Sequence, residues 1–104
     1  MNLILEINGE KKNFALGTIK GKTQRRYYEM RDILLDAEKG DLEYRTEHFD
    51  MMVGFICECF NNKFTADDLL ENLDIADINI WIMKIQKFIE DKTAAKMKKI
   101  SKNS

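Results

Sequence analysis

The sequence has no proline, a single histidine, two cysteines and five glycines in 104 residues. Proline is the residue that most strongly interrupts helices, so its absence favours a largely helical chain. No apolar run approaches the roughly 18 to 20 residues that a membrane-spanning helix requires. The opening residues also lack the basic region, apolar run and small-residue cleavage site of a secretory signal. We therefore expect a cytoplasmic protein that does not enter a membrane.

The residues that usually carry chemistry are equally sparse. His48 stands alone between acidic neighbours, which predicts a surface or helix-edge position rather than a base or a metal ligand. Gly17 and Gly21 fit no phosphate-binding motif. Cys57 and Cys59 would point about 200° apart on a helix, so they cannot share a metal or form a disulfide, and we interpret them as small apolar residues. The sequence therefore predicts no enzyme, no cofactor and no metal.

What the chain does contain is charge, at 34% of its residues, alongside 44% hydrophobic residues. This composition is typical of one small soluble domain. The net charge is only −1, but the signs are separated along the chain. Basic residues dominate between Lys11 and Asp32, acids dominate between Asp36 and Asp77, and the segment from Lys92 to Ser104 has five lysines and no acid. Such separation favours docking to a charged partner protein or to another copy of the chain.

Alternating apolar residues at the start predict a β-hairpin. Leu3 to Ile7 forms the first strand and Lys11 to Leu16 the second, joined by Asn8-Gly9, a pair that suits the positive φ angles of a type I′ turn. A hairpin of this size is marginally stable alone and must pack on helices. We therefore expect an α+β fold, mainly α, with the hairpin on a three- to four-helix core.

Four helices are predicted after a glycine-containing loop. Their expected ranges are Thr23 to Lys39, Thr46 to Phe60 with a possible start at Asp41, Ala66 to Asn72, and Asp74 to about Lys92. Thr65 with Asp68, and Asp74 with Asp77, have the spacing of capping boxes, which explains the adjacent acids Asp67 and Asp68 without a metal. We expect a domain at residues 1–92 and a disordered basic tail at 93–104.

Each long helix carries apolar residues outside its predicted core stripe. A surface helix of a monomer needs only one apolar stripe, so a second one indicates either burial on two sides or a partner-binding surface. Both alternatives remain open from the sequence. The candidates for partner binding are Tyr28, Leu35, Met51, Phe55, Ile80 and Met83.

A second reading comes from the basic-aromatic cluster Arg25-Arg26-Tyr27-Tyr28. Arginines next to aromatic rings can bind nucleic acid, which would make the protein a small nucleic-acid-associated regulator. The acidic middle of the chain argues against it because it would repel phosphate.

Two blocks of sequence resemble a known family. The opening has the form LxLEINGExxxF from Leu3 to Phe14, and Val53 to Asp74 has the form VxFxxxxFxNxFTxDDLLExLD, followed by an Ile-rich helix. Over residues 2–92 this order is similar to the tail assembly chaperones of long-tailed phages and prophages of Gram-positive bacteria.

The resemblance implies a non-virion protein that binds the tape measure protein, a long helical chain prone to aggregation, in the cytoplasm of the bacterial host. It implies no catalytic residues, and it allows homo-oligomers or a longer frameshifted form of the chain. The alternative within the same setting is a structural subunit of the tail.

Overall fold

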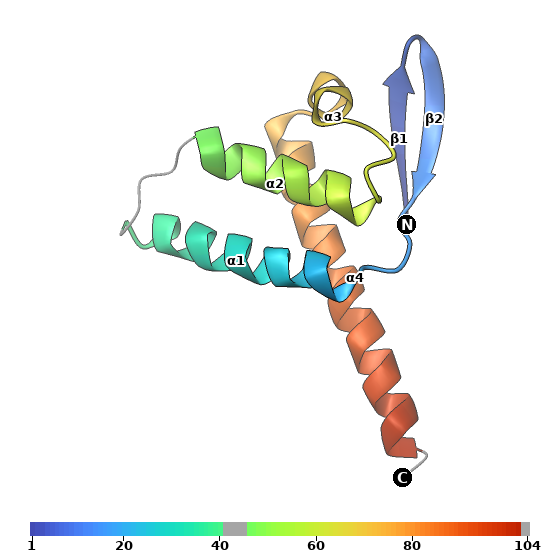
Figure 1. Ribbon diagram of the computed structural model, residues 1–104, viewed down its shortest axis with the longest axis vertical. Helices are drawn as coiled ribbons and strands as arrows, with labels where there is room; N and C mark the ends of the chain where they lie inside the picture. The colour runs from blue at the N-terminus through green and yellow to red at the C-terminus, as the bar shows by residue number, and fades with distance from the viewer. Residues whose placement is uncertain (41–45, 103–104) are drawn as a thin grey trace.

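The computed structural model describes residues 1–40 and 46–102 and has the predicted α+β, mainly helical architecture. Strands β1 (Asn2–Ile7) and β2 (Glu10–Ala15) precede helices α1 (Gly21–Glu38), α2 (Thr46–Cys59), α3 (Ala66–Asn72) and α4 (Ile75–Lys102). Helices α1 and α2 run side by side, α4 crosses behind them, and the hairpin lies next to α3 (Figure 1). The alternative start of the second helix at Asp41 lies outside the described residues.

The hairpin forms as predicted because its turn residues accept left-handed backbone geometry. Asn8 has a φ of 53° and Gly9 a φ of 79°, the signs that a type I′ turn requires. The strands pair antiparallel, with Leu3 opposite Phe14 and Ile7 opposite Glu10. This register places Leu3 in the core, where it is 3% exposed.

The open edge of β1 is covered by a side chain from α3. The Glu6 amide donates a hydrogen bond to Oδ1 of Asn72 at 2.8 Å, and Nδ2 of Asn72 donates to the Glu6 carbonyl at 3.0 Å. The Asn72 amide therefore pairs with this residue of the strand edge as a neighbouring strand would. It also fixes α3 against the hairpin.

Helix α2 is the centre of the core. The predicted stripe is buried at Met52, Val53, Ile56 and Phe60 and half-buried at Phe49. A second buried stripe, spaced at i, i+4, i+7 and i+11, consists of His48, Met52, Phe55 and Cys59. Two adjoining stripes leave α2 only a narrow polar side, so it is covered from two directions by its neighbours.

Aromatic rings from successive segments of the chain link the hairpin to α4. Phe14 contacts Phe64 with ring centroids 5.0 Å apart, Phe64 contacts Phe60 at 5.4 Å, and Phe60 contacts Trp81 at 5.7 Å. On the other side of α2, Phe55 packs against Tyr27 of α1 at 5.6 Å. Such pairs contribute about 0.5–1.5 kcal/mol each beyond their burial.

Both predicted capping boxes are confirmed. The Asp68 amide donates to Oγ1 of Thr65 at 3.1 Å, while the Thr65 amide donates to the Asp68 carboxylate at 3.0 Å. Asp74 and Asp77 repeat this exchange at 2.8 and 3.2 Å at the start of α4. The predicted end of α2 is confirmed by the left-handed φ angles of Asn61 and Asn62, 58° and 55°.

Two predictions about individual segments are wrong. Helix α4 continues to Lys102 instead of ending near Lys92. Alanine and lysine favour helix strongly, and no glycine or proline interrupts this stretch, so the helix persists without an apolar stripe. His48, expected at the surface, is 5% exposed because it lies on the second buried stripe of α2.

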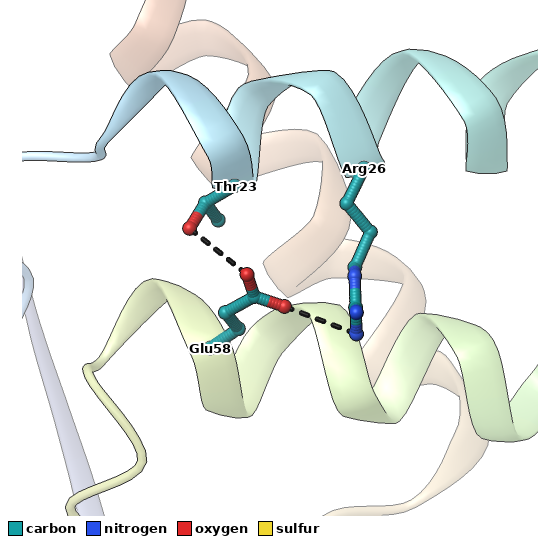
Figure 2. A network of polar contacts seen from close by, with 3 residues as sticks. All are labelled: Thr23, Arg26 and Glu58. Atoms are coloured by element: carbon teal, nitrogen blue, oxygen red, sulfur yellow. Dashed lines mark hydrogen bonds and ion pairs between the residues drawn. The ribbon is translucent and has the colours of Figure 1, made fainter.

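One carboxylate joins α1 to α2. Glu58 accepts a hydrogen bond from Oγ1 of Thr23 at 3.1 Å and pairs with Nη1 of Arg26 at 3.1 Å (Figure 2). Thr23 is 4% exposed, and the Glu58 side chain is 19% exposed. The hydroxyl therefore relies on Glu58 as its acceptor in a place that water reaches poorly.

We expect Glu58→Ala to lower the free energy of unfolding by about 1–2 kcal/mol, since it leaves the buried Thr23 hydroxyl without this acceptor. Glu58→Gln keeps an acceptor for Thr23 and should cost less. Glu29→Ala removes only an exposed ion pair with Arg25 and serves as the control, with an effect near zero. Urea titrations would give the three values. An equal effect of Glu58→Ala and Glu29→Ala would contradict this account.

The two thiols should be unreactive in the folded protein. Burial raises the pKa of Cys57, and it raises that of Cys59 from 9.0 to about 12. Only the thiolate attacks, so an aromatic disulfide reagent at neutral pH should label neither thiol until denaturant unfolds the chain. Rapid labelling that is insensitive to denaturant would show the thiols are accessible.

The raised pKa values also make the stability of the fold depend on pH. Because the thiols ionise at lower pH in the unfolded chain than in the folded protein, the free energy of unfolding should fall as the pH rises above 9.0.

Candidate partner-binding surface

Four of the six residues predicted for partner binding lie at the surface. Tyr28 and Leu35 of α1 are 43% and 42% exposed, and Ile80 and Met83 of α4 are 46% and 67% exposed. They belong to two separate helices, so the structure provides two small apolar patches on single helices. We call these the α1 patch (Tyr28, Leu35) and the α4 patch (Ile80, Met83).

The α1 patch borders the buried stripe of its helix. The Tyr28 hydroxyl accepts a hydrogen bond from Nε2 of Gln24 at 3.1 Å, and the guanidinium of Arg31 lies 4.8 Å from its ring centroid. These contacts come from one turn before and one turn after along α1. They position the ring at the surface with one face covered by a cation, where it can still present its edge to a partner.

The α4 patch lies on the side of its helix away from the core. Ile78, Ile82 and Ile85 are buried on the opposite side, where α4 packs against α2. The neighbouring Lys84 places its ammonium 4.9 Å from the Trp81 ring centroid. Ile80 and Met83 therefore lie on the side of α4 that faces water.

The other two predicted residues do not form an exposed face. Phe55 is 0% exposed, so the prediction that it is available to a partner is wrong: the helix is buried on two sides. Met51 is half-buried and packs against the same core. The wide apolar arc of α2 reflects its central position.

A groove that the sequence did not predict lies where α4 leaves the body of the protein. It has a volume of about 540 Å³ and lies between the segment after β2 and the middle of α4. The apolar residues that line it are Leu16, Ile19, Phe88, Ile89 and Met97. The two segments are far apart in the sequence, so no local sequence pattern predicts that they lie together. We call this feature the α4 groove.

The arginines considered for nucleic-acid binding are engaged in ion pairs. Arg26 pairs with Glu58 across to α2 (Figure 2), and Nε of Arg25 lies 3.5 Å from the Glu29 carboxylate. Tyr27, the ring beside them, is 6% exposed. Phosphate would compete with both carboxylates for these arginines, and Tyr28 is the remaining surface ring of the cluster. This geometry disfavours the nucleic-acid reading.

Residues 1–40 and 46–102 contain no group of three or more histidine, cysteine or acidic side chains placed to hold a metal ion. Within the same residues, no helix is long and apolar enough to cross a membrane. The two apolar patches and the α4 groove lie at the surface of the described residues. Exposed apolar side chains of this kind suit contact with another protein.

Comparison with known proteins identifies the family. Searches of curated proteins and of solved structures each gave no match. The sequence does match a family described as "Phage tail chaperone protein", and the match covers residues 1–104. This extent includes the hairpin, the capped helices and α4, and it agrees with the resemblance carried by the two sequence blocks. The chain therefore belongs to the phage tail chaperone family.

Proposed function

We propose that this chain is a non-enzymatic tail assembly chaperone that binds the tape measure protein through exposed apolar helix faces. It would keep that protein soluble during tail assembly. The family match over residues 1–104 supports the role in assembly. The observation that supports the mode of binding is that Tyr28, Leu35, Ile80 and Met83 remain exposed on helices whose other faces are buried.

The physical basis is the hydrophobic effect: both the tape measure protein and this chain expose apolar surface that is more stable when it is removed from water. A long helical chain that has not yet been enclosed by a tail tube exposes apolar stripes, and such stripes associate with each other. Helices of another protein can cover these stripes side by side, since apolar residues spaced three and four apart provide matching ridges and grooves. Small patches give weak individual contacts, which allows release when the tail polymerises.

The setting follows from the same proposal. The protein acts in the cytoplasm of the bacterial host and is left out of the mature virion. It binds as a monomer, as a homo-oligomer or with a longer frameshifted form of itself that shares this domain. The charge separation along the chain is compatible with contacts between copies.

Co-expression tests the proposal directly. The tape measure protein of the same phage should be soluble and co-purify with this chain, and it should precipitate when expressed alone. Retention of the tape measure protein on a tagged chain, followed by quantification of the soluble fraction, provides the measurement. If solubility is unchanged and nothing is retained, the proposed function is wrong.

Substitution at the exposed patches should weaken binding without unfolding the chain. Each of Leu35→Asp and Ile80→Asp should lower affinity about tenfold, equivalent to about 1.4 kcal/mol, with little change in Tm. Ile4→Asp is the matched control, because Ile4 is 62% exposed on the hairpin and lies outside both patches. Phe55→Asp should instead unfold the chain, since it buries a charge. Unaltered binding by both patch variants would exclude these surfaces.

Mass spectrometry of purified virions separates the chaperone from a structural subunit of the tail. A chaperone should be abundant in infected cells and absent from virions that contain the tape measure protein. Stoichiometric amounts of the chain in purified tails would assign it to the tail structure instead.

A further inference from the structure

The exposed end of α4 carries two apolar side chains beyond the part of the helix that packs in the core. Ile82, Ile85 and Ile89 lie along one side of the helix, and Ile100 follows Ile89 by eleven residues, which returns it to that side. Ile100 is 71% exposed, and Met97, one turn earlier, is 65% exposed. The C-terminal part of α4 extends beyond the other elements (Figure 1). Met97 and Ile100 are thus apolar side chains exposed on the outer part of α4, and Lys92, Thr93 and Lys96 occupy the positions between them and Ile89.

The floor of the α4 groove is already apolar and partly shielded from water. Leu16 is 8% exposed, and Ile19, Phe88 and Ile89 are half-buried against the core. Met97 stands at the outer end of the same groove. An apolar side chain entering here would bury additional apolar surface on a floor that is fixed by the fold, which favours binding.

The charged residues that line the groove are basic. Lys92 and Lys96 line it, no acidic residue does so among the described residues, and Nζ of Lys92 lies 5.5 Å from the Phe88 ring centroid. Lysines near the end of a helix also counter its dipole, which accounts for those in the last turn. Lys92 and Lys96 lie more than one turn before Lys102, where that effect has declined, so their position is not explained by the helix end.

We propose that the α4 groove is the docking site for an acidic amphipathic helix of a partner protein. Its apolar side chains would contact Phe88, Ile89 and Met97, and its carboxylates would face Lys92 and Lys96, which lie between them on α4. The charge complementarity selects this occupant over a basic or uncharged helix. The proposal rests on the proposed function in so far as the tape measure protein supplies that helix.

Two synthetic peptides test the chemistry of the groove. Both are 18-residue amphipathic helices with the same leucine stripe, one flanked by glutamates and the other by lysines. Fluorescence anisotropy should show the glutamate peptide binding at least tenfold more tightly than the lysine peptide. Its affinity should fall with added salt, because part of the attraction is between exposed charges.

Matched variants locate the binding. Lys92→Gln/Lys96→Gln should reduce the preference for the glutamate peptide to about twofold or less, because glutamine keeps the length and helix propensity but not the charge. Met97→Gln should weaken both peptides. Ile4→Gln/Lys63→Gln changes one exposed apolar and one exposed basic residue outside the groove, and it should leave both affinities unchanged. Circular dichroism should show the same helix content in every variant.

The outcomes separate this inference from the proposed function. Equal affinity for both peptides, or binding unaffected by the groove variants, would overturn the assignment of the groove even if the tape measure protein co-purifies. Light scattering that shows a dimer lost on Met97→Gln, with no peptide bound, would overturn it in favour of a second copy as occupant. Peptide binding with the expected selectivity would support the groove assignment even if the tape measure protein fails to co-purify.

Discussion

The burial of α2 on two sides is the constraint on which the rest of the structure depends. Phe55 packs against α1 on one side, and Phe60 contacts Trp81 of α4 on the other. A small domain has room for one helix in this position, so the remaining elements must arrange themselves around it. The hairpin is too small to be stable alone and depends on the ring of Phe64 and the amide of Asn72 for its place.

The same constraint explains which features the sequence could predict. The turn at Asn8-Gly9 and the two capping boxes were predicted correctly because each depends on residues within four positions of one another. The apolar arc of α2 was ambiguous, since two buried sides and an exposed interface give the same pattern. Phe55 was misplaced for that reason, and His48 was misplaced because its acidic neighbours suggested a surface position; the burial of both depends on how the other elements pack on α2, which no local spacing records.

The packing of α1 and α4 on α2 also decides which residues are exposed at the surface. The candidates on α1 and α4 are exposed, because those helices pack on α2 with one face and leave another in water. The α4 groove could not be predicted, since it joins Leu16 and Ile19 to residues that follow about 70 positions later. One signal was present. Met97 and Ile100 follow Ile89 at helical spacing, but this spacing has a structural meaning only if the helix extends past Lys92.

The extension of α4 follows from how helices form. An isolated helix of about 13 residues is marginal in water because its first turn must be nucleated at a cost in conformational entropy. Residues after Ile89 avoid that cost, since they continue a helix already fixed by Ile78, Ile82 and Ile85 in the core. Ala94, Ala95 and the lysines then need only their intrinsic propensity to remain helical. A partner helix that docks here would therefore contact a helix that is already formed, and its binding free energy would not be reduced by the cost of ordering α4.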